Sequence, residues 1–255
     1  MIKFFRKIRQ KLLTENKFGK YLIYAIGEIA LVMIGILLAL QVNNWNQNNN
    51  NKKAETYYLN QMKIDLTADS LFLSNTTLNL NKRLPVLENF LRELNKENNK
   101  ESFNDAIKQY IDIILEPLFF VSNNATYNEM ESSAKLGIIN DAELRKKIVA
   151  LYNHLEITKN IFSVNYEFMQ PVDAELIYGK GLAKYQKNQK ALFTSYLSDE
   201  ELYKLKEIKF ELESNIANWN WTIIDMKPVV EFQLSEIGDV IDQINKHLEK
   251  KEQVF

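Results

Sequence analysis

A run of apolar residues near the start of the chain constrains the fold more than any other feature. Residues 21–42 read YLIYAIGEIALVMIGILLALQV, with Glu28 as the single charged residue. At 1.5 Å per residue, a helix of this length is about 30 Å long and can cross the hydrocarbon core of a bilayer. The apolar core of a cleaved signal peptide is shorter, about 7–15 residues, and no small-residue cleavage pattern follows this run. The sequence therefore predicts an uncleaved transmembrane helix over 21–42.

The charge around this helix predicts its orientation. Residues 1–20 hold seven basic residues and one acidic residue, whereas the first basic residue after the helix is Lys52. Positive charge close to a span marks its cytoplasmic side. We therefore expect a single-pass protein of the bacterial inner membrane with a cytoplasmic N-terminus and a periplasmic C-terminal domain.

Residues 1–20 also form a basic amphipathic segment. Basic side chains occupy one helical face, and the other face carries Met1, Phe4, Phe5, Ile8 and Leu12. A helix of this kind lies on an anionic membrane surface. The anionic inner leaflet of the bilayer is therefore the first expected partner.

The composition after the span favours helices. About 200 residues follow it, which is enough for one sizeable core. The whole chain has only 7 Gly and 4 Pro in 255 residues, whereas a β-rich domain needs more turn residues. The predicted fold class is all-α: one N-terminal transmembrane helix, an Asn-rich connector over 43–53, and an extracytoplasmic antiparallel helical bundle with coiled-coil-like packing over 54–255.

Heptad patterns predict how these helices pack. Leucine recurs every seven residues over 59–94, although the companion positions of the repeat are poor, and Pro85 should kink this helix or start a new one. Apolar residues recur at a mean spacing of 3.5 over 202–223 and alternate at four and three over 230–248, on either side of Pro228. The pattern predicts two antiparallel helices. The same repeats suit self-association, so a homo-oligomer or another membrane protein is the expected protein partner.

Capping signals predict helix ends. Capping boxes of the type Ser/Thr-x-x-Glu occur at 126–129 and at 198–201. Gly137 is expected to stop the helix that the first box opens, and Asn140 to cap the next helix.

No catalytic or metal-binding constellation is evident. The chain has 2 histidines and no cysteine, so a zinc site would need carboxylates to complete it. Phosphate-binding loops and nucleophile elbows are absent. The mildly acidic exported part has no electrostatic footprint for nucleic acid. We expect no catalytic residue, metal, cofactor, small-molecule substrate or nucleic-acid partner, and hence a protein that is not an enzyme.

Glu28 is the candidate for chemistry inside the span, because intramembrane carboxylates are costly. It shares a helical face with Val32, Gly35 and Ala39, and small residues four apart let another helix approach closely. This face predicts helix packing. The alternative is that Glu28 carries protons, as in the single-span subunits of ion-driven motors, a comparison of architecture alone.

Two blocks of the chain resemble a family of single-span membrane proteins from Bacteroidota, of flavobacterial type. The blocks are residues 1–46, with the pattern YAIGEI…IGILLAL…NNWN, and residues 126–153, TYNEMESSAKLGIINDAELRKKIVALYN. The resemblance implies an inner-membrane protein with a periplasmic helical domain, and it carries no activity. Members of the family have glycine where this chain has Ala134, which bears on how closely the backbone can approach there.

The resemblance singles out residues in both blocks. At the membrane these are Gly27, Glu28, Gly35, Asn43, Asn44 and the interfacial anchor Trp45. In the second block they are Thr126, Tyr127, Glu129, Ser132, Ser133, Lys135 and Leu136. Glu129, Ser132 and Ser133 would share one face of a helix that starts near Tyr127. That face suits a buried structural network, a partner surface or a ligand site.

The leading hypothesis is a membrane-anchored, non-enzymatic interaction or scaffold protein. One alternative is a periplasmic ligand-sensing module that acts through a membrane partner. The other is an ion-coupled subunit that uses Glu28.

Overall fold

The described part of the chain is helical and contains no β-strand, which confirms the all-α prediction for those residues. The computed structural model describes residues 18–96, 100–186, 189, 192–193 and 197–252. Residues 1–17 of the predicted amphipathic segment over 1–20 lie outside the described residues. In chain order the elements are α2 (Phe18–Leu94), α3 (Lys100–Leu115), α4 (Ala125–Ser132), the 3₁₀ turn η1 (Leu136–Ile138), α5 (Ala142–Ala174), the π-helical turn η2 (Glu175–Gly179), the 3₁₀ turn η3 (Leu182–Tyr185), α6 (Asp199–Glu207) and α7 (Lys209–Glu252).

Two compact units make up the chain: unit 1, Met1–Tyr57, and unit 2, Tyr58–Phe255. The described part of unit 1 is the first portion of α2, and the helix continues through the Asn-rich residues 43–53. Among the described residues, one helix is long and apolar enough to cross a membrane, and its apolar window has a mean hydropathy of 2.3 with no residue buried. The predicted apolar helix is therefore present.

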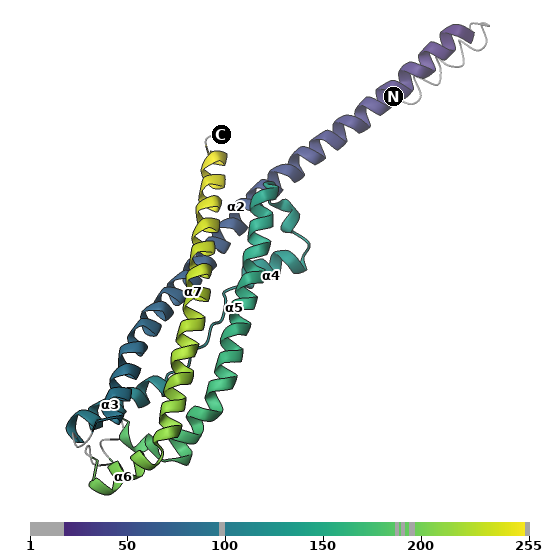
Figure 1. Ribbon diagram of the computed structural model, residues 1–255. Helices are drawn as coiled ribbons and strands as arrows, with labels where there is room; N and C mark the ends of the chain where they lie inside the picture. Colours follow the sequence, from purple (N-terminus) through teal and green to yellow (C-terminus); the bar gives the residue numbers. More distant parts are fainter. Residues whose placement is uncertain (1–17, 97–99, 187–188, 190–191, 194–196, 253–255) are drawn as a thin grey trace. The chain divides into compact units, whose positions relative to one another are not determined.

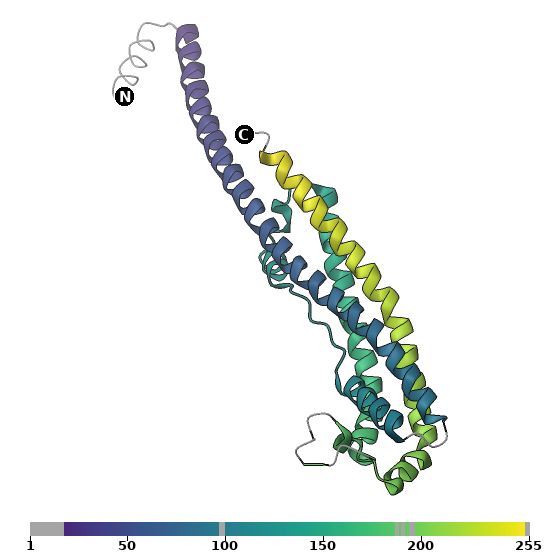
Figure 2. The same cartoon turned by 90° about the vertical axis from the view of Figure 1, so that its left-hand side faces the viewer.

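Unit 2 is built on three long helices. The part of α2 from residue 58 onward, α5 and α7 lie side by side in both views (Figure 1, Figure 2). One stripe of α2 faces the core, at alternating spacings of three and four residues. Its buried members are Leu59, Met62, Leu66, Asp69, Leu73, Thr76, Leu80, Arg83, Leu87, Phe90 and Leu94. The leucine repeat is thus a core stripe, in which each leucine contributes about 1.5–3 kcal/mol by burial.

Contacts between the long helices give their directions. Between α5 and α7, Lys147 pairs with Asp239 at 2.8 Å, and Thr158 donates to Gln233 at 3.0 Å. Residue numbers rise along α5 as they fall along α7, so these two helices run in opposite directions.

The same reasoning places α2. Lys63 donates to Asn245 at 3.2 Å near one end of unit 2, and Lys209 donates to Asn95 at 2.6 Å near the other. Hence α2 also runs opposite to α7 and in the same direction as α5. The chain returns between α2 and α5 through α3 and the extended residues 117–124.

Prolines lie inside three of the helices. Of the two outcomes predicted for Pro85, a new helix is excluded, since α2 continues to Leu94. The predicted helical pair over 202–223 and 230–248 is wrong, because α7 passes through Pro228 without interruption and packs on α5. All three prolines, including Pro171 in α5, are on the exposed side of their helices. The carbonyl that each leaves without its helical donor therefore faces solvent, where water can replace the lost hydrogen bond.

Helix starts are only partly as predicted. The capping box of α6 is confirmed: Ser198 Oγ accepts from the Glu201 amide at 3.2 Å, and the Glu201 carboxylate accepts from the Ser198 amide at 2.8 Å. The cap of α5 is Asp141 rather than Asn140. Its carboxylate accepts from the amides two and three residues later, both at 3.0 Å.

Candidate functional site

The membrane-helix residues lie on α2 in unit 1. Glu28, Val32, Gly35 and Ala39 follow one another at four, three and four residues, so they share one side of the helix. The last three are exposed. A Cβ atom added at Gly27 or Gly35 would meet no atom of the described residues within 4 Å. This side is therefore open to the close approach of another helix, and its use for packing or ion coupling stays a prediction.

The predicted interface anchors follow on the same helix. Asn43, Asn44 and Trp45 are exposed, Trp45 by 70%. An indole that projects freely can settle at the headgroup level of a bilayer, and this anchoring role also stays a prediction.

The second block of the resemblance folds back onto α2. The Tyr58 hydroxyl on α2 donates to the Glu129 carboxylate at 2.5 Å and accepts from the Lys135 ammonium at 3.1 Å. The Ser132 and Ser133 hydroxyls donate to the Glu129 carbonyl at 3.2 and 2.6 Å. The two Tyr58 contacts fasten α4 and Lys135 to α2, whereas the two serine hydroxyls bond within α4. Glu129, Ser132, Ser133 and Lys135 are exposed, so these contacts differ from the buried structural network that is one of the three interpretations of this face.

Tyr127 attaches α4 to α5. It is buried, and its ring stacks on Tyr152 of α5 with the centroids 4.2 Å apart and the planes at 16°. Burial raises the pKa of Tyr127, and the neighbouring carboxylate of Glu131 adds to the shift. A role of this face in binding a partner or a ligand stays a prediction.

Two aspartates of α2 hold the first turn of α4 and the chain that precedes it. Asp65 accepts from the Thr126 hydroxyl at 2.5 Å. Asp69 is fully buried and accepts from the Ser122 hydroxyl at 2.9 Å and from the Asn123 amide and side chain at 2.9 and 2.6 Å. Burial raises the pKa of Asp69 even though these hydrogen bonds act in the opposite direction.

The predicted capping box at 126–129 is therefore wrong. The helix begins at Ala125 after Asn124, which makes no capping hydrogen bond with its side chain. Thr126 and Glu129 have the sequence of a capping box, but tertiary partners on α2 take both side chains. A local pattern of this kind cannot reveal partners about 60 to 70 residues away.

Ala134 ends α4 in a left-handed conformation, with a φ of 54°. The Lys135 amide donates to the Met130 carbonyl at 2.8 Å, and the Ala134 amide donates to the Glu131 carbonyl at 3.0 Å. These two bonds make a Schellman motif, whose left-handed position favours glycine. Gly137, predicted to stop this helix, lies beyond its end in η1.

A buried polar cluster joins four helices near the far end of unit 2 from Tyr58. Asp173 of α5 accepts hydrogen bonds at Oδ1 from Asn215 at 2.8 Å and from the Trp219 indole at 3.0 Å, both on α7. Asn215 also accepts from the Tyr110 hydroxyl of α3 at 2.6 Å. The Arg83 guanidinium of α2 lies 4.8 Å from the centre of the Trp219 ring. All five residues are buried.

Arg83 directs its donors away from Asp173. Its two terminal nitrogens donate to the carbonyls of Ile113 and Glu116 at 3.0 and 2.9 Å, and its Nε donates to Asn79 at 3.2 Å. The Glu116 carboxylate lies 3.4 Å from one of these nitrogens. Burial lowers the pKa of Arg83 to about 10, so the side chain is still a cation at neutral pH. It closes the C-terminal end of α3 by donating to the Glu116 carbonyl and to the Ile113 carbonyl, which also accepts from the Glu116 amide at 3.2 Å.

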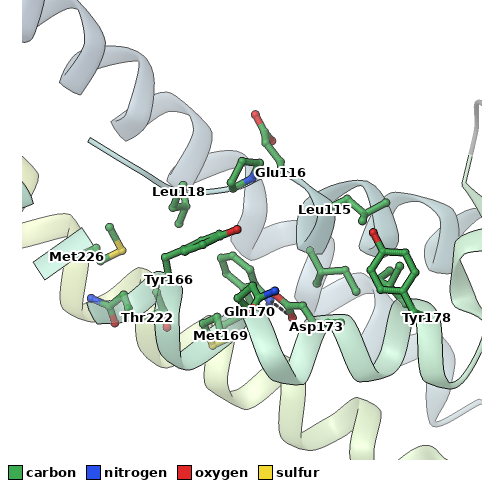
Figure 3. A pocket seen from close by; sticks show the side chains of 16 residues that line it. Leu115, Glu116, Leu118, Tyr166, Met169, Gln170, Asp173, Tyr178, Thr222 and Met226 are labelled. Atoms are coloured by element: carbon green, nitrogen blue, oxygen red, sulfur yellow. Dashed lines mark hydrogen bonds between the residues drawn. The ribbon is translucent and has the colours of Figure 1, made fainter. Parts of the chain in front are cut away.

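Asp173 lies at a cavity of about 200 Å³ that is bounded by the end of α3, α5, η2 and α7. Figure 3 shows Asp173 among the lining side chains, between Tyr166 and Tyr178 along the helix. Burial raises the pKa of Asp173 to about 6, although hydrogen bonds from Asn215 and Trp219 and the charge of Arg83 act in the opposite direction. The remaining walls are formed largely by Ile114, Leu115, Pro117, Leu118, Met169, Ile177 and Met226.

The sequence held a signal for these sites that the prediction did not use. Asp69 and Arg83 lie three residues after leucines of the repeat, at positions that a zipper needs to be apolar. Both are buried in the core. Asp173 interrupts the inward stripe of α5 in the same way, as does Asn215 on α7. A charged or amide side chain in phase with a core stripe is buried and needs partners, which makes it a candidate for a site.

Comparison with known proteins gives a family without an activity. In the part of the chain that the structure describes, no three of His, Asp or Glu gather to hold a metal ion. No curated protein and no solved structure matches the sequence. A family model described as "Family of unknown function (DUF6090)" matches residues 28–170, which is more than half of the chain and includes Arg83 and all of α4. The chain therefore belongs to this family of unknown function, DUF6090.

Proposed function

We propose that this chain is a membrane-anchored, non-enzymatic interaction protein that pairs with a second copy of itself through α2. The observation that supports the proposal is an unfilled apolar seam on the outer side of that helix. Ile64, Leu71 and Leu78 are 60%, 64% and 57% exposed, although they recur every seven residues. Ala68 and Asn75, also exposed, fill the intervening positions. We name these five residues the α2 seam.

The α2 seam has the spacing of a helix pair. Its members alternate at four and three residues, as the a and d positions of a coiled coil do. Leucine or isoleucine occupies every d position, and the a positions hold Ala68 and Asn75. A single asparagine at an a position sets register and a two-stranded state at some cost in stability. These features favour an in-register pair of identical helices.

Anchoring in a membrane favours the same partner. The α2 helix contains both the apolar span and the seam. Two copies that enter one membrane in the same orientation present their seams in parallel. In this proposal the basic N-terminus is cytoplasmic and the bundle is periplasmic, according to the charge distribution around the span.

Disulfide trapping tests the pairing in the intact protein. The chain has no cysteine, so Ile64→Cys introduces a unique thiol. Position 64 meets itself only in a parallel, in-register pair, whereas the central position 71 would meet itself in either orientation. Two Cβ atoms about 3.5–4.5 Å apart can form a disulfide. We expect Ile64→Cys to give a covalent dimer on mild oxidation of native membranes.

The matched control is Ser235→Cys, a near-isosteric change at an exposed position of α7. It should remain monomeric under the same oxidation. Equal yields of dimer from the two variants would show random collision in the membrane and would refute the proposal. Adding Leu71→Lys to Ile64→Cys should abolish the crosslink, because it places two like charges in the seam.

A second candidate function is ligand sensing in unit 2. It is favoured by the cavity beside Asp173, where one ligand would contact α5, α7 and the segment after α3 together. A ligand that binds one arrangement of these elements better than another shifts their equilibrium.

A further inference from the structure

The Asp173 carboxylate presents an unused acceptor to the cavity. Both of its hydrogen bonds, from Asn215 and Trp219, end on Oδ1. No donor within the described residues reaches Oδ2. The side chain is 8% exposed and belongs to the cavity lining. A carboxylate oxygen that belongs to a mostly enclosed side chain, faces a cavity and lacks a protein donor is a strong site for a charged donor from a ligand.

The charge at the cavity selects for a cation. Two of the lining side chains are charged, Glu116 and Asp173, and both are acidic. Arg83 lies behind them and is committed to the Ile113 and Glu116 carbonyls rather than to Asp173. Together the three charged residues leave one net negative charge, which one monocation would balance. An anion would meet the Asp173 carboxylate there, whereas the Glu116 carboxylate points away from the cavity (Figure 3).

The walls select for an apolar body of limited size. Methionine and aliphatic side chains form half of the lining, and methionine adapts its shape to a ligand. A cavity of about 150 Å³ admits benzene, so 200 Å³ admits a single ring with a short chain. Tyr166 and Tyr178 are exposed at the edge and can attract a cation with their ring faces. A bare metal ion is disfavoured because calcium needs six or more oxygen ligands.

We propose that this cavity binds a small primary amine with an apolar or aromatic body, with its ammonium group donating to Asp173 Oδ2. The site is independent of the α2 seam, since it lies on other faces of unit 2, and it deepens the sensing candidate by naming its ligand class. The charged and titratable groups that face Asp173 are Arg83 from α2 and Tyr110 from α3, whereas the Glu116 carboxylate lies on Asn79 and Arg83. The amine requires an ionised Asp173, so affinity should fall about tenfold per pH unit below about 6.

Calorimetric titration of the full chain in phosphatidylcholine nanodiscs tests the proposal, with phenethylammonium as the probe. We expect saturable binding at pH 7.5. Its neutral analogue 2-phenylethanol should bind roughly 10- to 100-fold more weakly, because it offers no charged donor, and 3-phenylpropionate should not bind. Equal affinity for the amine and the alcohol would overturn the proposal, and so would the absence of saturable binding at about 1 mM amine.

Two variants separate the site from general effects of the lipid. Asp173→Asn keeps an acceptor for Asn215 and Trp219 but removes the charge, and it should lose at least tenfold in amine affinity. Asp225→Asn, the same change at an exposed position of α7, should bind as the native protein does. Ala174→Leu narrows the cavity and leaves the carboxylate in place, so it decides the matter if Asp173→Asn does not fold. Native-like affinity in Ala174→Leu or in folded Asp173→Asn would refute the site.

Discussion

Replacing Ala134 by glycine is expected to stabilise unit 2. Ala134 is held at a φ of 54° by the two hydrogen bonds that end α4. A left-handed conformation costs an L-residue about 1–2 kcal/mol and costs glycine nothing. Glycine also gives the unfolded chain more conformational freedom, which reduces this gain in stability by about 0.4–1 kcal/mol. The net expectation is a gain of about 1 kcal/mol in the free energy of unfolding.

The assay is thermal unfolding of the full chain in detergent, followed by far-UV circular dichroism. In a domain of this size, 1 kcal/mol shifts Tm by about 2–4 °C. The matched control is Ala217→Gly, at an exposed position inside α7. There the backbone is helical, so glycine should lower stability by about 1 kcal/mol.

The two substitutions are chemically identical and should differ in sign. If Ala134→Gly lowers Tm as Ala217→Gly does, position 134 is not in a left-handed conformation in solution. The Schellman motif at the end of α4 would then be wrong.

Three further predictions concern charged groups. Burial raises the pKa of Asp173 from 3.8 to about 6. The protonated carboxyl therefore makes its full contribution to stability below pH 3.8, and this contribution, roughly 3 kcal/mol, is lost as the pH rises through about 6. Asp173→Asn should remove this loss from the free energy of unfolding, measured by chemical denaturation across this pH range. Arg83→Met removes one donor from the buried Ile113 carbonyl, which keeps the Glu116 amide, and one from the part-buried Glu116 carbonyl. It should cost about 1–3 kcal/mol in the same assay, and a neutral effect would contradict the closure of α3 by Arg83. In the span, Glu28→Gln should leave oligomers intact on a native gel while Gly35→Leu disrupts them, since bulk at position 35 blocks close approach. Loss of cellular function in Glu28→Gln with oligomers intact would instead favour ion coupling.

The helical fold class and the core stripe of α2 could be predicted because they follow from local patterns. Seven-residue spacing of leucine requires one buried face wherever the helix packs, and those leucines are buried. The path through Pro228 could not be predicted in this way. Its effect depends on whether the freed carbonyl faces solvent, and that is fixed only when α7 packs on α5.

The candidate site was the harder part to predict. The polar members of core stripes, such as Asp69 and Asp173, marked it in the sequence, yet their partners lie about 40 to 55 residues away. A local pattern therefore predicts that such a residue is buried, but not what it binds. For the same reason the local pattern at Thr126 predicts a helix cap, whereas the Thr126 hydroxyl donates to Asp65.

The opposite directions of α2 and α7 have a mechanical consequence. Residues near the start of unit 2, such as Lys63, lie against Asn245 near the end of α7. Tension between the membrane anchor and anything attached to the C-terminus would thus enter unit 2 at one end of the bundle. It would peel α2 from α7 one contact after another, starting at Lys63 and reaching the Asn95–Lys209 contact last. A load that acts on contacts in sequence opens a structure at lower force than a load shared among all of them. Pulled this way, unit 2 should yield gradually, and the Asp173 cavity would be among the last parts to open.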